Sequence, residues 1–274
     1  MNQKEFFPVF SHLILNPKTT VIYFQGDIQN FQNEIERIYE EYSLEKTMKI
    51  LKEKFPDSNI LMPKPKLIKG FADYSKFLPP KKNQKHQIIA FNFLYNSLLF
   101  YCKSLKIDFP EQFIIIGFSR GSVVLERLVQ EIAYLNKNQK DPKFSKMFDF
   151  SKKIISFYWL DAHLFPHEND DILNFSNFIK NTSHINIFIF ATPRQIYDQT
   201  RPWIGQQKKF FCKNLKENNI QFYYKLFFKE LKKSQCGIFH HFKTLELFQS
   251  NPTNELTNES TNESTNESTN ESIN

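Results

Sequence analysis

The sequence has very little glycine. Only six of its 274 residues are glycine, roughly a third of what the average usage near 7% would give. This scarcity excludes collagen-like chains, glycine-rich linkers and glycine-marked propeller repeats. Because glycine is otherwise avoided, each one is expected where the backbone needs it. The six are Gly26, Gly70, Gly117, Gly121, Gly205 and Gly237.

Cysteine and long apolar runs are scarce as well. The three cysteines, Cys102, Cys212 and Cys236, are far apart and never form a C-x-x-C pair. This spacing argues against a disulfide framework or a structural zinc site and favours a reducing compartment. No apolar run reaches the roughly 18–20 residues of a membrane span. Residues 1–17 lack the basic and apolar regions of a secretory signal, so we expect neither secretion nor a transmembrane segment.

Acidic residues are in the minority and are unevenly placed. The chain has 36 Lys and Arg against 29 Asp and Glu, a net charge of +7. Residues 251–274 hold five Glu and no Lys or Arg, so residues 1–250 alone carry +12. A basic body could attract nucleic acid or anionic lipid. However, the chain lacks a phosphate-cradling loop, zinc-finger spacing and an RNA-binding aromatic signature. We expect no nucleic-acid partner, no cofactor and no metal.

The C-terminal end is a low-complexity repeat. From residue 253 the tetrad T-N-E-L is followed by four copies of T-N-E-S, without any aromatic residue. Such a segment cannot bury a core. The sequence therefore predicts one folded domain over residues 1–250 and a disordered tail over 251–274.

Short apolar runs alternate with amphipathic stretches along the body. Strands are predicted at 21–24, 59–62, 113–116, 154–160, 185–191 and 220–228, and helices at 44–55, 88–105, 123–135, 172–179, 206–215 and 242–248. Continuously apolar strands separated by helices indicate a mostly parallel sheet with helices on both faces. We predict a three-layer α/β fold whose site lies in loops at the carboxyl ends of the strands.

One of those loops carries a G-x-S-x-G motif. Gly117-Phe118-Ser119-Arg120-Gly121 follows the predicted strand 113–116 and leads directly into a predicted helix. This is the context of the nucleophile elbow of α/β-hydrolases, a turn so tight that larger side chains two residues from the serine would collide with its neighbours. The helix N-terminus adds positive potential where negative charge develops. The competing interpretation is a tight turn with a structural serine.

A nucleophilic serine needs a base and an orienting acid, which follow it in this fold in the order acid, then histidine. Asp161 follows the first strand after the motif, and Asp198 follows the second. The second strand is the usual place for the acid, which favours Asp198, with Asp161 as the alternative. For either aspartate, a loop carboxylate making local turn bonds is the competing interpretation.

The base is expected after the last strand. His240 and His241 lie there, and His241, beside the start of the predicted last helix, is preferred over His240. His163 and His167 flank Asp161, and their spacing could suggest a metal, but the acids that follow favour a solvated loop. The remaining histidines are interpreted as structural or surface residues: His12, His86 and His184.

An oxyanion hole requires two backbone N–H donors. One is expected at Arg120, directly after the serine, and the other in the strand-end loop of Gly26 and Asp27. Gly26 allows the backbone to approach a substrate closely. A simple strand-end turn is the competing interpretation of this loop.

Several segments together resemble one protein family. They include Gly-Asp-Ile-Gln-Asn at 26–30 and Arg-Pro-Trp-Ile-Gly at 201–205, and the full set is 24–30, 55–56, 63–74, 117–125, 159–161, 192–205 and 241–242. The chain resembles a largely uncharacterised eukaryotic family with an α/β-hydrolase-like fold, typified by a human mitochondrial protein of a chromosome 2 open reading frame. The resemblance implies a serine-hydrolase-like core around Ser119, with Asp27, Asp161 and Arg201 as candidates for the pocket rim. It also implies a mitochondrial location for some members, so cytoplasm and mitochondrion both stay open.

The predicted function is that of a serine hydrolase, an esterase, lipase-like enzyme or thioesterase acting on a small-molecule or lipid-like acyl substrate. A catalytically inactive protein of the same fold, acting as a binding or regulatory module, is the alternative. A third and weaker hypothesis is an anionic-lipid or nucleic-acid binder that uses the basic body. The sequence gives no signal for a protein partner.

Overall fold

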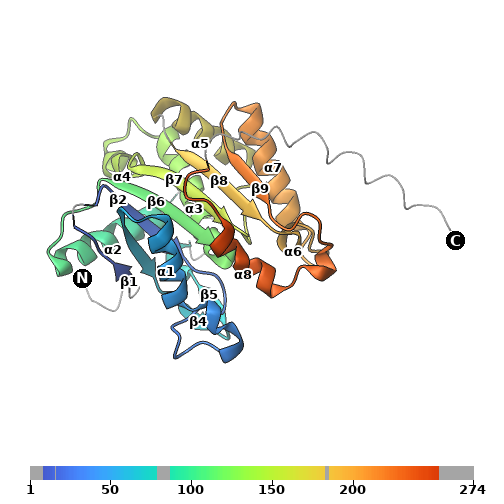
Figure 1. The fold of residues 1–274 in the computed structure, drawn as a ribbon. Coiled ribbons are helices and arrows are strands. Elements are labelled where there is room, and N and C mark those ends of the chain that lie inside the picture. The colour runs from blue at the N-terminus through green and yellow to red at the C-terminus, as the bar shows by residue number, and fades with distance from the viewer. Residues whose placement is uncertain (1–8, 16, 79–86, 183–184, 253–274) are drawn as a thin grey trace.

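A seven-stranded sheet forms the centre of the protein (Figure 1). The computed structural model describes residues 9–15, 17–78, 87–182 and 185–252. The strands of the sheet are β1 (Val9–His12), β2 (Thr19–Phe24), β3 (Ser58–Pro63), β6 (Gln112–Phe118), β7 (Ile154–Leu160), β8 (Asn186–Ala191) and β9 (Tyr223–Leu226). Their order is β1-β3-β2-β6-β7-β8-β9, with β1 antiparallel to β3 and all other neighbours parallel. This order, with one antiparallel edge strand, is that of the α/β-hydrolase fold and confirms the predicted class.

Helices cover both faces of this sheet (Figure 1). They are α1 (Leu44–Lys54), α2 (Ala90–Leu105), α3 (Ser122–Lys137), α4 (Ser145–Ser151), α5 (Asn169–Thr182), α6 (Pro193–Ile196), α7 (Trp203–Glu217) and α8 (Ile238–Leu247). Alternate residues of β2 face opposite ways: Val21 and Tyr23 pack in the core with α1 and α8, whereas Ile22 and Phe24 pack with α2, α3, α5 and α7. A strand buried on both faces has to be apolar throughout, and this explains the continuous apolar runs of the sequence.

The predicted elements are present, but some features were missed. The sequence analysis did not find β1, α4 or the separate hairpin of β4 (Lys66–Ile68) and β5 (Phe71–Asp73). These elements are short, so they have too few residues for a periodic pattern. The last helix begins at Ile238 rather than at Phe242, which puts His240 and His241 inside its first turn. The predicted tail lies, from residue 253 on, outside the described residues.

A charged side chain from one helix fixes the start of another. The carboxylate of Glu131 on α3 accepts hydrogen bonds from the N–H groups of Ile89, Ala90 and Phe91 at 2.8–2.9 Å. It also pairs with Arg127 Nε at 2.8 Å, and both charged side chains are almost fully buried. Since α2 has no side-chain cap of its own, Glu131 supplies the acceptor that its first N–H groups need.

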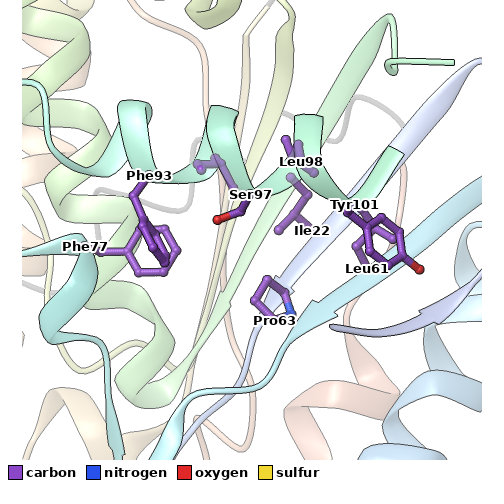
Figure 2. A pocket seen from close by; sticks show the side chains of 9 residues that line it. Ile22, Leu61, Pro63, Phe77, Phe93, Ser97, Leu98 and Tyr101 are labelled. Carbon is purple, nitrogen blue, oxygen red and sulfur yellow. The ribbon is translucent and has the colours of Figure 1, made fainter. Parts of the chain in front are cut away.

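A small apolar cavity lies between α2 and the sheet (Figure 2). Its volume is about 20 Å³, room for roughly one water molecule. Ser97 Oγ points into it and has no hydrogen-bond partner within the described part of the chain. None of the predicted site residues lines the cavity. The residues that line it are Ile22, Leu61, Pro63, Phe77, Phe93, Leu94, Ser97, Leu98 and Tyr101.

Candidate active site

Ser119 occupies a strained turn at the carboxyl end of β6. Its φ angle is +49°, in the left-handed region that is unfavourable for residues other than glycine. A single 3-10 turn, Ser119–Gly121, leads from the strand into α3. A Cβ atom at Gly121 would lie 2.1 Å from the carbonyl oxygen of Phe24 at the end of β2, so only glycine fits there. Strain at the serine and a close approach at the following glycine are both typical of a nucleophile elbow.

A buried histidine–aspartate pair lies at the same end of the sheet. His241 Nδ1 is 2.6 Å from Asp161 Oδ2, and both side chains are buried. The Asp161 carboxylate also accepts hydrogen bonds from the backbone N–H and the hydroxyl of Thr192, each at 2.7 Å. Because Nδ1 faces a carboxylate, it carries the proton and leaves the lone pair of the neutral ring on Nε2. A general base requires this tautomer.

The structure corrects the preference for Asp198 as the partner of the histidine. The Asp198 carboxylate accepts hydrogen bonds from Thr200 and from Arg201 Nε within its own loop, at 2.8–3.0 Å. Burial opposes ionisation of Asp198, but the bonds from Thr200 and Arg201 outweigh it and hold the pKa of the carboxyl well below its usual range. Asp161, which directly follows β7, the strand beside β6, meets His241 instead.

The imidazole of His241 lies against the residue that precedes Ser119. Its ring stacks on Phe118, with ring centroids 4.6 Å apart and an angle of 28° between the planes. Ser119 Oγ forms no hydrogen bond with any described residue. In substrate-free sites this bond is often long and tightens only when substrate is bound.

His240 does not fit the role of alternative base. Its Nδ1 accepts the N–H of Gly237 at 3.2 Å, and its ring packs edge-on against Phe228. Consecutive residues of a helix point in different directions, about 100° apart. Since both histidines lie on α8, only His241 reaches the aspartate.

The loop of Gly26 and Asp27, predicted to supply an oxyanion donor, has one N–H that is occupied and one without a described acceptor. The N–H of Gly26 donates to Gln29 Oε1 at 2.9 Å, so Gly26 is not a free donor. It is nevertheless required for space, because a Cβ there would lie 2.9 Å from Ser119 Cβ. The N–H of Asp27 has no acceptor among the residues described. Arg120 lies in the first turn of a helix, where N–H groups have no acceptor within the helix.

Charged groups interact around Arg120, the residue that follows Ser119. Arg120 Nη1 lies 3.2 Å from His163 Nε2. Burial, together with the charges of Arg120 and Arg201, lowers the pKa of His163 to about 4. Burial raises the pKa of Asp27, although the N–H of Ala72 and the nearby positive charges oppose this shift. Asp27 and Arg201, two of the candidates for the pocket rim, therefore lie within electrostatic reach of each other.

The sequence analysis missed one residue, Ser122, that connects the turn at Ser119 to the loop after Asp161. Ser122, fully buried at the start of α3, donates its hydroxyl to the carbonyl oxygen of Ser119 at 2.7 Å. The same hydroxyl accepts the N–H groups of His163 and Leu164, both at 3.0 Å. A serine near a helix start is common, so nothing in the sequence distinguished this one.

The two histidines that follow Asp161 do not converge. His163 faces Arg120, whereas His167 Nδ1 lies 3.2 Å from the carbonyl oxygen of Phe165. In the described part of the chain, no group of three or more His, Cys, Asp or Glu side chains is arranged to hold a metal ion. None of the helices described there is long and apolar enough to cross a membrane.

Comparison with known proteins gives one family. The family model C2orf69 matches residues 14–108 and 96–221. The human mitochondrial protein C2orf69 is 27% identical over 85% of this chain and 74% of its own length. Its mouse homologue is 27% identical over 83% of this chain and 77% of its own length. The zebrafish homologue is 25% identical over 83% of this chain and 72% of its own length.

Two solved structures of low sequence identity overlay on the protein. One is a dienelactone hydrolase-like promiscuous phosphotriesterase, P91, from metagenomic libraries. It is 10% identical, with a TM-score of 0.41 over 77% of this chain and 71% of its own. The other is an acylaminoacyl peptidase from Pyrococcus horikoshii. It is also 10% identical, with a TM-score of 0.47 over 87% of this chain and 38% of its own.

Proposed function

The chain belongs to the C2orf69 family, and from the site it carries we propose that it is a serine hydrolase that cleaves an ester or thioester. The observation that supports this most is the buried pair of His241 and Asp161, with an Nδ1–Oδ2 distance of 2.6 Å, beside the strained Ser119. A histidine held in this tautomer and packed on the residue before a strained serine can take the proton of a serine hydroxyl.

In the proposed acylation step, Ser119 Oγ attacks the carbonyl carbon of the substrate. Its proton moves to His241 Nε2, and Asp161 stabilises the imidazolium that results. The negative charge on the carbonyl oxygen is held by the N–H groups of Arg120 and Asp27. The bond to the alcohol or thiol then breaks, and the leaving group takes the proton from His241 Nε2.

Deacylation repeats the same proton transfers with water. His241 takes a proton from a water molecule, whose oxygen attacks the acyl carbon bonded to Ser119. Collapse of the second tetrahedral intermediate returns the proton from His241 to Ser119 Oγ and releases the carboxylic acid. The enzyme ends in its starting state, and no cofactor enters the balance.

A fluorophosphonate probe, which reacts with activated serines, tests the proposal. We expect the folded protein to be labelled, Ser119→Ala to be unlabelled, and His241→Ala to be labelled at least about a thousandfold more slowly. Ser104→Ala is the matched control, because Ser104 is exposed and bonds only to a carbonyl of its own helix. Labelling that persists in Ser119→Ala would contradict the role of this serine.

One observation favours the alternative of an inactive binding module. Ser119 Oγ and His241 are not hydrogen-bonded in the described structure, although the pair of His241 with Asp161 is fully formed. If the protein only binds ligands, the wild type will unfold cooperatively, as a folded protein does, and yet remain unlabelled. The probe experiment separates the two functions, provided that unfolding is measured on the same sample.

The relatives' names also bear on location. The three relatives are named as mitochondrial proteins or homologues of one, and on that basis we propose a mitochondrial location for this chain. Fractionation of cells that express the full chain tests this. Recovery in the cytosolic fraction alone would contradict it.

A further inference from the structure

Arg120 differs from Arg127 and Arg201 in its partner. Arg127 pairs with Glu131 and Arg201 with Asp198, each at 2.8 Å. Arg120 instead places Nη1 against a ring nitrogen of His163 at 3.2 Å. No carboxylate of the described residues lies within ion-pair distance of its guanidinium.

The contact with His163 does not neutralise this charge. A guanidinium has only donors, so His163 Nε2 must accept with its lone pair, and the ring proton lies on Nδ1. Burial and the two nearby arginines favour this neutral ring, with a pKa lowered to about 4. At neutral pH, Arg120 therefore keeps a full positive charge in a partly buried position.

This charge lies next to the proposed nucleophile. Arg120 follows Ser119 in the chain, and the N–H of His163 donates to the carbonyl oxygen of Ser119 at 3.1 Å. Asp27 is a nearby acid whose pKa responds to Arg120. Its Oδ1, however, accepts the N–H of Ala72 at 2.8 Å, and Asp27 forms no ion pair with Arg120. The charge of Arg120 is thus held in place without a partner of opposite sign in contact.

We infer, building on the proposed hydrolase function, that Arg120 binds an anionic group of the substrate, a carboxylate or a phosphate, close to the scissile bond. The planar guanidinium presents paired N–H donors that match two oxygens of either group. A partly buried charge without a counter-ion is unfavourable, and an anionic substrate removes that disadvantage whereas a neutral one does not. The substrate is therefore an ester or thioester whose acyl or leaving part carries a negative charge.

Matched substrates test this inference. We compare kcat/KM for the 4-nitrophenyl monoester of glutaric acid with that for 4-nitrophenyl butyrate, and use a phosphate-bearing ester of similar length as a third arm. The wild type is expected to prefer at least one anionic ester by about tenfold or more, the size of one charge-assisted hydrogen bond. The preference should decrease in high salt, because salt screens the attraction. The better anionic arm distinguishes a carboxylate from a phosphate.

Variants connect the preference to the side chain. Arg120→Gln retains the backbone N–H and is expected to reduce the preference to less than about twofold, with Arg120→Lys in between. Lys213→Gln removes one positive charge near the end of α7, on an exposed side chain paired with Glu217, and should leave the preference unchanged. If Arg120→Gln lowers activity on neutral and anionic esters equally, the inference is overturned.

The outcome is informative even if the Arg120 variants do not fold or no ester is turned over. Glutarate and inorganic phosphate are then tested as protectants of the wild type against fluorophosphonate labelling, with glutaramide as the neutral control. Protection by an anion but not by glutaramide supports the inference. Labelling of Ser119 without protection overturns the inference and leaves the hydrolase proposal intact. Absence of labelling in the folded wild type overturns both.

Discussion

Replacing Asp161 by asparagine should nearly abolish reactivity of the site. Asp161 Oδ1 accepts a hydrogen bond from the backbone N–H of Thr192. Asp161 Oδ2 accepts hydrogen bonds from the hydroxyl of Thr192 and from His241 Nδ1. An asparagine must keep its oxygen on the backbone N–H, because that donor cannot turn into an acceptor. Its NH₂ group then replaces Oδ2 and donates to His241 Nδ1.

This exchange reverses the tautomer of His241. If Nδ1 accepts, the ring proton moves to Nε2, and no lone pair remains to take the proton of Ser119. In a serine protease the same substitution lowers the rate by about 10⁴, equivalent to about 5.5 kcal/mol of transition-state stabilisation. We expect fluorophosphonate labelling and ester hydrolysis of Asp161→Asn to slow by about 10³–10⁴-fold. The free energy of unfolding should decrease by only about 1–3 kcal/mol.

Asp198→Asn is the matched control. Its carboxylate pairs with Arg201 and makes local bonds with Thr200, so the rate of labelling should change by less than about threefold. Labelling rates and urea unfolding are measured on both variants, which separates loss of reactivity from loss of fold. A large loss in Asp198→Asn, or labelling of Asp161→Asn at close to the wild-type rate, would refute the assignment of the acid.

Three further predictions concern stability and are measured by urea denaturation. Gly121→Ala should destabilise the protein by about 3 kcal/mol or more, since the new methyl would lie 2.1 Å from the Phe24 carbonyl oxygen. Gly237→Ala, with nothing within 4 Å, should be near neutral. Glu131→Gln breaks a buried ion pair and should cost about 3 kcal/mol, so an unchanged midpoint would contradict the capping role of this side chain. The pKa of His163 is about 4 in the folded protein against an ordinary 6.5, so the unfolded chain binds more protons and stability decreases as pH falls from 7 to 4. In His163→Asn, the free energy of unfolding should therefore decrease by about 1–3 kcal/mol less over this pH range than in the wild type. Identical pH profiles of the variant and the wild type would refute this.

Ser119 shows what the sequence could determine about the site. A strand can turn directly into a helix only where the residues beside the turn are small. The two glycines around Ser119 meet this requirement within five residues, so the turn could be predicted from the sequence. His241 could be predicted as the candidate base because chain order in this fold puts the base after the last strand. The layers of the fold were equally predictable, since continuous apolar runs such as 113–116 require burial on both faces.

The partner of His241, the N–H groups without an acceptor and the surroundings of Arg120 could be seen only in the tertiary structure. Asp161 and Asp198 both follow strands, and nothing local indicates which one His241 on α8 will meet. From the sequence, the N–H of Gly26 was a suitable oxyanion donor, but in the structure it donates to Gln29 Oε1. Asp161 and Arg120 each meet a side chain from a distant segment, at 2.6 Å and 3.2 Å. Gln29 is close to Gly26 in the chain, but its amide is oriented by Tyr23 and Thr47. Such contacts follow from how strands and helices pack, whereas local patterns were sufficient to predict the class of fold and the turn that carries the serine.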